Sequence, residues 1–188
     1  LTSQQVAAIM AETIQVPGGM TVPPPEYLKK LQALAEDWGA LLVLDEAQLA
    51  PGRTGRMWAF EHYDVVPDIV TFGKGMSAGM AITGATTTPE IAEQARGKAG
   101  VPWAGTYSSA PLPAAIALKQ LQIVIRDDLT TRAMRLGELL EEKLGRLKQR
   151  FEFIGDVRGL GLCQMLDIVE DRQSKKADFN MAERITAR

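Results

Sequence analysis

The 188-residue chain is long enough for a domain with a sizeable core, and its 46% hydrophobic and 23% charged residues are ordinary for a soluble globular protein. A formal net charge of −2 argues against nucleic acid or an anionic membrane as a main partner. No apolar run approaches the roughly 20 residues that span a bilayer. Cys163 is the only cysteine and His62 the only histidine, which excludes an internal disulfide and a Cys/His zinc site. We therefore expect a metal-free, cytoplasmic protein.

Strand and helix patterns alternate along the chain, which favours a mainly parallel sheet. Strands are expected at residues 6–11, 40–44, 68–72 and 82–86, and helices at 26–38, 89–96, 111–125 and 129–150. The run at 40–44 is apolar without alternation, as in a strand covered on both faces. The fold class indicated is α/β.

Beyond residue 150 the pattern changes to two adjacent strands, 153–158 and 160–168, around Gly159 and Gly161. This predicts a domain boundary near Gln149, with residues 1–149 in one domain and 150–188 opening a second, α+β domain. The chain starts at Leu1 and stops at Arg188 inside a helix-like pattern. We interpret it as the central fragment of a larger protein.

Asp45 ends the most hydrophobic strand, in the run Leu41-Leu42-Val43-Leu44-Asp45-Glu46. Ligands of open parallel sheets bind at the carboxyl ends of the strands, so Asp45 is a candidate binding residue. An acid there can hold a pyridine nitrogen protonated. Taken alone it is as readily a solvated acid or a cap of the next turn.

Lys74 follows the predicted strand 68–72 and stands between Gly73 and Gly75. A lysine directly after an apolar strand is expected to be partly desolvated, which lowers its pKa and makes it a nucleophile for a carbonyl group. The glycines are expected to let a cofactor ring approach the backbone. Asp45 and Lys74 together form the pair that a pyridoxal phosphate enzyme needs.

Three further residues carry weaker signals. Gln48 can donate to a phenolate oxygen where the chain leaves the strand, and small Ala47 can pack on a ring face. Thr106 lies in the loop 100–110, ahead of the helix that Pro111 begins. A hydroxyl there can serve a phosphate group or only the turn backbone.

An apolar strand ending in Asp-Glu is also typical of the magnesium-binding strand of a P-loop ATPase. That interpretation needs a G-x-x-x-x-G-K-[ST] loop. Position 68 is Asp and position 75 is Gly, so the segment before Lys74 is not such a loop. A P-loop ATPase fragment stays an alternative, as does a non-catalytic scaffold relative.

The ordered blocks of sequence resemble the central part of the class III (ω-type) aminotransferases. The matching blocks are residues 11–12, 18–19, 44–48, 52–55, 67–70, 73–75, 105–107 and 155–159. The resemblance implies the aspartate aminotransferase fold (fold type I), with a PLP-binding large domain and the beginning of a small domain. It implies an enzyme, a transferase that uses pyridoxal 5′-phosphate. Its function would be to move an amino group between an amine or amino acid and a keto acid.

Residue by residue, the resemblance makes Lys74 the Schiff-base lysine and Asp45 the partner of the pyridinium nitrogen. Gln48 would contact the ring hydroxyl and Ala47 the ring face. Thr106 would bind the cofactor phosphate of the other subunit, which implies a homodimer. Glu12 matches an acid on the substrate side of the site.

Within the family, Ala47-Gln48 and the segment 111–115 look most like the decarboxylating transaminases of the dialkylglycine decarboxylase kind, which is the nearest alternative. Four positions depart from the family pattern. Thr13 replaces the usual Pro, Leu49-Ala50 replaces Thr-Gly, and Pro17 stands where the decarboxylase has a hydroxyl residue.

Overall fold

The computed structural model describes residues 6–97 and 105–187. The first part of the predicted loop 100–110, up to residue 104, lies outside the described residues. The order of elements is as follows: β1 (Ala8–Glu12), α1 (Tyr27–Asp37), β2 (Leu41–Asp45), the 3₁₀ turn η1 (Ala59–Tyr63), β3 (Ile69–Phe72), the 3₁₀ turn η2 (Lys74–Ser77), β4 (Gly84–Thr87), α2 (Pro89–Gly97), α3 (Pro111–Arg126), α4 (Leu129–Arg150), β5 (Ile154–Leu160), β6 (Cys163–Ile168) and α5 (Phe179–Thr186). Each predicted strand and helix is present, with bounds shifted by one or two residues in most cases.

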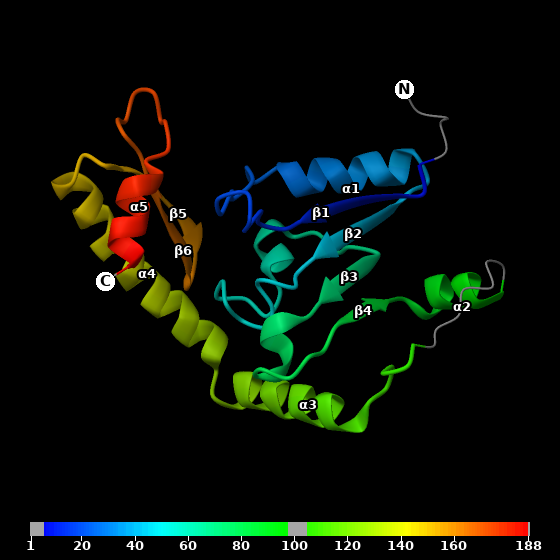
Figure 1. The fold of residues 1–188 in the computed structure, drawn as a ribbon. Helices are drawn as coiled ribbons and strands as arrows, with labels where there is room; N and C mark the ends of the chain where they lie inside the picture. Colours follow the sequence, from blue (N-terminus) through cyan, green and yellow to red (C-terminus); the bar gives the residue numbers. More distant parts are fainter. Residues whose placement is uncertain (1–5, 98–104, 188) are drawn as a thin grey trace.

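The first four strands form one sheet in the order β1-β2-β3-β4 (Figure 1). Strands β1, β2 and β3 are parallel, and β4 runs antiparallel to β3. The mainly parallel α/β architecture expected from the sequence is therefore confirmed. Parallel strands place their carboxyl ends at one edge of the sheet, and this edge carries the predicted site residues.

Helix α1 packs against β1 and β2 and supplies one side of the main core. That core contains Leu28, Ala35, Leu42, Leu44 and Tyr63, each less than 8% exposed. The helical periodicity of α1 directs Leu28 and Ala35 to one face, while the continuous apolar run of β2 fills the sheet side. This packing fixes where β2 ends, and so fixes Asp45.

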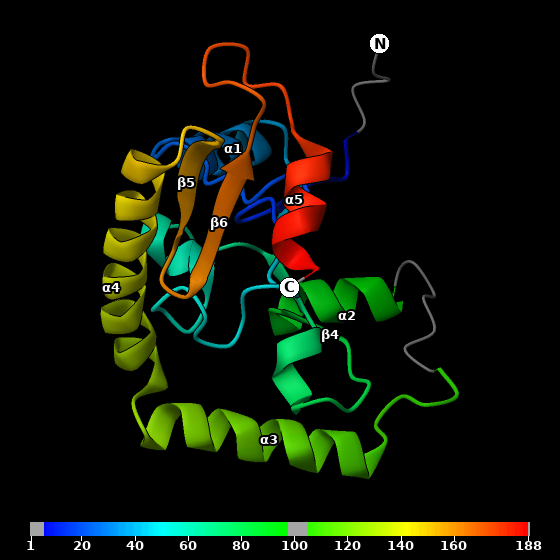
Figure 2. The same ribbon diagram turned by 60° about the vertical axis from the view of Figure 1, so that its left-hand side comes forward.

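Strands β5 and β6 form a separate antiparallel hairpin that lies along α4, with α5 beside β6 (Figure 2). Helix α4 contacts α3 at one end and this hairpin along its length, so it connects the two sheets. The domain boundary near Gln149 stays a prediction.

The turn of the β5–β6 hairpin packs between α4 and the loop after β2. A Cβ atom added to Gly137 of α4 would lie 2.5 Å from backbone atoms of Gly161 in the hairpin turn. A Cβ atom added to Gly161 would lie 2.5 Å from the carbonyl carbon of Thr54. Contacts this short admit no side chain, so glycine is required where the three segments cross.

Alanine substitutions at two glycines of α4 are therefore expected to change the stability in opposite directions. Gly137→Ala is expected to lower the free energy of unfolding by about 1–3 kcal/mol, because its methyl group overlaps the hairpin turn. Gly145→Ala is the matched control on the same helix, since nothing lies within 4 Å of its added Cβ. It is expected to raise stability by roughly 0.5–1 kcal/mol. Urea unfolding of both variants measures the difference, and equal values would show that the crossing is not tight.

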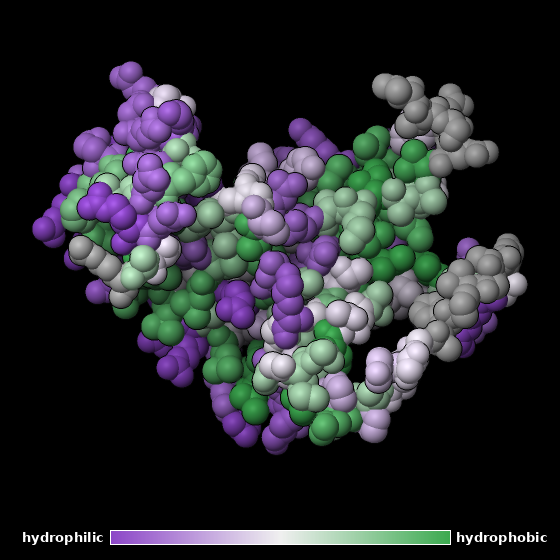
Figure 3. Space-filling model, in the orientation of Figure 1, coloured by the Kyte–Doolittle hydropathy of each residue, from purple (hydrophilic) through white to green (hydrophobic). Residues whose placement is uncertain are grey.

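The molecular surface differs between the two sheets. Figure 3 shows hydrophilic side chains gathered over the part that holds α5 and the hairpin, and hydrophobic surface over β1 and the end of α1. Exposed large apolar side chains of β1 and of the end of α1 include Met10, Leu34 and Trp38. None of the described helices is long and apolar enough to cross a membrane.

Candidate active site

The carboxyl ends of β1, β2 and β3 bring three polar side chains side by side. Glu12 of β1 is the register partner of Asp45 of β2, and Asp45 is the register partner of Thr71 of β3. Register partners on parallel strands direct their side chains to the same face of the sheet. Lys74 follows three residues after Thr71, so the two acids and the lysine that the sequence singled out belong to one edge.

Asp45 shapes the turn that leads away from β2. Its Oδ1 atom accepts a hydrogen bond of 2.8 Å from the backbone N–H of Ala47. This Asx-type contact starts the turn that holds Ala47 and Gln48, both of them half-buried. The remaining carboxylate oxygen, Oδ2, makes no hydrogen bond within the described residues.

Lys74 begins the turn η2 in a left-handed backbone conformation, with φ at 42°. Such a conformation costs a non-glycine residue about 1–2 kcal/mol, so the surrounding contacts must hold it. The Lys74 side chain is exposed. The expectation that it is desolvated by its position after β3 is therefore wrong for the described residues, because the strand ends at the rim of the sheet.

The glycines around Lys74 serve the packing of the protein itself. A Cβ atom on Gly73 would lie 3.3 Å from the carbonyl oxygen of Ile82, and one on Gly75 would lie 3.1 Å from that of Ala50. The space expected for a cofactor ring is occupied by backbone on these sides. The two glycines thus set the course of the loop that carries Lys74.

A hollow of about 320 Å³ opens beside Lys74. Its lining includes Gln48, Arg53, Lys74, Gly75, Cys163 and Gln164. Four separate segments converge there, namely the loop after β1, which supplies Val16 and Met20, the turn after β2, the turn η2 and the β5–β6 hairpin. The hollow therefore depends on the glycine crossing that seats the hairpin.

Of the predicted site residues, Lys74 and Gln48 line this hollow, and the other candidates do not. Glu12 lines a smaller hollow of about 170 Å³ next to the loop after β1. Thr106 lines a third hollow, of about 780 Å³, with residues of the β4 approach and the start of α3. Asp45 and Ala47 line none of these hollows.

Sequence reasoning missed two polar residues of the hollow, Arg53 and Gln164. Arg53 lies in the 52–55 block, and its guanidinium stands 3.7 Å from the position of a Cβ on Gly75. Gln164 donates through Nε2 to the carbonyl of Gly161 at 3.2 Å, and its buried Oε1 has no partner. No local signal marks Gln164, because only the docking of the hairpin brings it to Lys74.

Cys163, at the start of β6, is 7% exposed and belongs to the core. Its thiol donates to the Met20 sulfur at 3.3 Å, and burial raises the pKa of the thiol, although Arg53 opposes the shift. The thiol is therefore protonated at neutral pH. No group of three or more metal-binding side chains assembles among residues 6–97 and 105–187.

Glu46 was not predicted to have a special role, yet its side chain is fully buried. It accepts hydrogen bonds from the Thr13 hydroxyl at 2.5 Å, the Ala59 N–H at 2.9 Å and the Phe60 N–H at 3.1 Å. Neighbouring residues of a strand point to opposite faces, so Glu46 turns inward beside Asp45. This carboxyl ties the end of β1, the turn after β2 and η1 together. Thr13, where the family pattern has Pro, supplies one of the three donors.

The burial of the Glu46 carboxyl predicts that the stability of the protein depends on pH. Burial raises the pKa of Glu46 above its ordinary value of 4.5, while its three donors partly offset the shift. The folded state then holds this proton more tightly than the unfolded state. The stabilisation is full below pH 4.5 and is lost as pH rises through the raised pKa. Urea unfolding between pH 4 and 8 should show this decline in the parent and not in Glu46→Gln. The same slope in both would assign it to another group.

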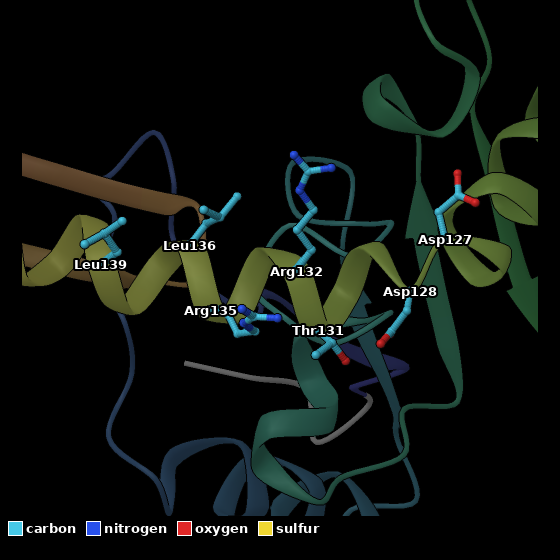
Figure 4. A pocket seen from close by; sticks show the side chains of 7 residues that line it. All are labelled: Asp127, Asp128, Thr131, Arg132, Arg135, Leu136 and Leu139. Atoms are coloured by element: carbon cyan, nitrogen blue, oxygen red, sulfur yellow. The ribbon is translucent and has the colours of Figure 1, made fainter.

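Another hollow, of about 500 Å³, follows the first turns of α4 (Figure 4). The side chains of Arg132 and Leu136 point to one side of the helix, and that of Thr131 points to another. Side chains that diverge cannot surround a small molecule. This hollow contains no predicted site residue and is not a candidate active site.

Residues 1–187 match the family described as Aminotransferase class-III. The chain belongs to the class III aminotransferases. An uncharacterized aminotransferase of Schizosaccharomyces pombe is 44% identical over 175 residues, which is 93% of this chain and 39% of that protein. An alanine/serine racemase of Pyrococcus horikoshii is 40% identical over 167 residues, 89% of this chain and 34% of that protein.

Solved structures of the family agree with the fold. A Bacillus anthracis aminotransferase superposes with a TM-score of 0.91 at 33% identity, covering 99% of this chain and 43% of that one. The Toxoplasma gondii ornithine aminotransferase superposes with a TM-score of 0.82 at 33% identity, covering 88% of this chain and 39% of that one. The class III chain therefore has fold type I. It spans about two fifths of the length of the relatives it matches.

Proposed function

We propose that the complete protein is a pyridoxal phosphate-dependent aminotransferase that moves an amino group between an amine or amino acid and a keto acid. The observation that carries the proposal is the position of Lys74. It follows the carboxyl end of β3, beside the Asp45–Glu12 edge, and opens on a hollow shared with Gln48. Aminotransferases among the relatives support this function over the decarboxylating alternative.

The described residues fit pyridoxal phosphate. Lys74 offers an exposed amine for its aldehyde, and Asp45 a carboxylate with one oxygen unbonded. The hydroxyl of Thr71, the register partner of Asp45, is buried without a hydrogen-bond partner, as is Oε1 of Gln164 on the hollow. Buried polar atoms without partners are rare, and a bound polar group would satisfy them. The structure of the Toxoplasma gondii relative has partial occupancy of PLP at its active site.

When bound, the cofactor supplies an electron sink conjugated to the reacting carbon of the substrate. The residues of the chain would hold it and handle protons. Lys74 would carry the cofactor aldehyde as a Schiff base and, once displaced by the amino donor, move a proton at the substrate carbon. Asp45 would hold the pyridine nitrogen protonated, the Gln48 amide would donate to the ring hydroxyl oxygen, and Ala47 would pack on the ring face. Glu12 would lie on the substrate side.

The proposal includes a homodimer in the cytoplasm. Thr106 supports the dimer, because it lines a hollow separate from that of Lys74 and is exposed. In that arrangement Thr106 would bind the phosphate of the cofactor held by the partner subunit. The single, buried Cys163 thiol is compatible with a reducing compartment.

Amino acid racemisation is a second candidate, because a racemase is 40% identical to the chain. Both reactions need the same lysine to move a proton at the substrate carbon. They differ in the acceptor, since amino transfer consumes a keto acid and racemisation does not. Loss of optical activity from an amino acid without any keto acid would favour the racemase.

Reductive trapping tests the proposal. The complete polypeptide is incubated with pyridoxal phosphate, reduced with borohydride and digested, and the labelled peptide is mapped. We expect the label on Lys74 and amino transfer from an amine or amino acid to a keto acid. A folded protein that takes no label at Lys74 would exclude this function and favour the scaffold or nucleotide-binding alternatives.

A further inference from the structure

A side chain outside the hollow reaches the turn that carries Lys74. Gln120, in the middle of α3, donates from Nε2 to the backbone carbonyl of Gly75 at 2.6 Å. This hydrogen bond is partly buried and joins residues 45 positions apart in the chain. Among the described residues, it is the only side-chain hydrogen bond from another element to the backbone of η2.

The turn η2 packs against α3. Figures 1 and 2 both show the short helical turn after β3 lying directly against this helix, and α3 and η2 are in contact. Met76 and Ser77 of the turn are buried, whereas Lys74 at its start is exposed. Packing thus fixes the end of η2, at Met76 and Ser77. The conformation of its start, at Lys74, depends on hydrogen bonds.

Those hydrogen bonds hold an unfavourable backbone conformation. Lys74 has φ at 42°, and the Met76 N–H donates to the carbonyl of Gly73 at 3.0 Å across the turn. The Gln120 hydrogen bond restrains the carbonyl of Gly75, the residue that follows Lys74. A left-handed residue persists only where its neighbours over-determine it. Without the amide donor, the Gly75–Met76 peptide that carries this carbonyl can turn, and the left-handed conformation of the adjacent Lys74 loses a restraint.

We propose that Gln120 is a positioning residue, which sets the direction of the Lys74 side chain through the Gly75 carbonyl. The proposal rests on the proposed function, because it assigns Gln120 a part in presenting the Lys74 amine. Gln120 lies on a 16-residue helix, which gives a rigid support, and rigid supports hold reactive groups to within fractions of an ångström.

Helix α3 offers a matched control. Gln122 lies two residues further along the same helix, is exposed and makes no hydrogen bond within the described residues. The variants are therefore Gln120→Met and Gln122→Met, since methionine keeps the length of glutamine and removes the N–H donor. Both substitutions favour the helix equally, so helix propensity does not separate them.

The experiment measures three quantities in the complete polypeptide. The first is amide hydrogen exchange of the peptide spanning residues 73–80 without cofactor. The second is the rate at which pyridoxal phosphate and cyanoborohydride label Lys74 relative to the other lysines. The third is kcat and KM with a working amino donor. We expect Gln120→Met to speed exchange and slow labelling several-fold, and to reduce kcat about 10-fold with KM unchanged. Gln122→Met should match the parent.

Two results would overturn the inference. One is equal exchange and labelling in the two variants. The other is a lower melting temperature of Gln120→Met with unchanged labelling of Lys74 in the folded fraction. That result would indicate that Gln120 has a structural role alone. If Gln120→Met does not fold, Gln120→Glu at pH 7 replaces it, because the carboxylate keeps the shape and cannot donate. Absence of Lys74 labelling in the parent would instead count against the proposed function.

Discussion

Lys74→Ala is expected to reduce amino transfer by roughly 10³-fold or more, because proton transfer by a placed base alone contributes about 10²–10⁴-fold. The variant also removes the amine that holds the cofactor aldehyde. Folding should be unaffected, since the side chain is exposed and makes no hydrogen bond or ion pair with any residue that the structure describes. Alanine in the left-handed conformation is no more strained than lysine. Single-turnover kinetics and the melting temperature measure both effects.

Lys119→Ala provides the comparison for Lys74. Lys119 lies on α3 and is exposed as well, so this variant removes the same charge without touching the turn η2. Its activity should stay within twofold of the parent. If Lys74→Ala retained more than about a tenth of parental activity, the amine would not be the group that moves the proton, and the assignment of Lys74 would fail.

The parts of the fold that depend on local patterns could be predicted from the sequence. The apolar run of β2 and the amphipathic spacing of α1 each specify one element and the face it buries. The direction of β4 could not be predicted, because Gly84–Thr87 has no apolar pattern of its own. Its antiparallel register with β3 is defined by the sheet partner rather than by the strand.

The site shows the same division. Asp45 and Lys74 could be found because Asp45 ends an apolar strand and Lys74 follows another after a single glycine. Glu46 could not, because two adjacent acids look alike in a sequence and only the completed core decides which one turns inward. Gln164 and Gln120 could not be found either. Gln164 comes to the hollow beside Lys74 through the glycine crossing, and Gln120 reaches the turn η2 from α3, so both act from elements distant in sequence.

Asp45→Asn is expected to lower kcat by roughly 10²–10³-fold, in the range seen when one preorganised electrostatic contact is removed. Asparagine keeps the size of the side chain and the oxygen that accepts from the Ala47 N–H at 2.8 Å, so the turn toward Gln48 should persist. What is lost is the negative charge that would hold the pyridine nitrogen protonated. Steady-state kinetics give kcat, and absorbance titration with pyridoxal phosphate gives the affinity for the cofactor.

Asp37→Asn separates this effect from a general change of charge. Asp37 ends α1, is exposed and makes no hydrogen bond or ion pair within the described residues. Its neutralisation should leave kcat and cofactor affinity unchanged. An Asp45→Asn variant with parental kcat would show that Asp45 serves only the turn. If Asp45→Asn lowers the melting temperature and the activity together, the hydrogen bond from the Ala47 N–H requires the charged carboxylate. A selective loss of kcat and cofactor affinity in a folded protein would identify Asp45 as the partner of the ring nitrogen.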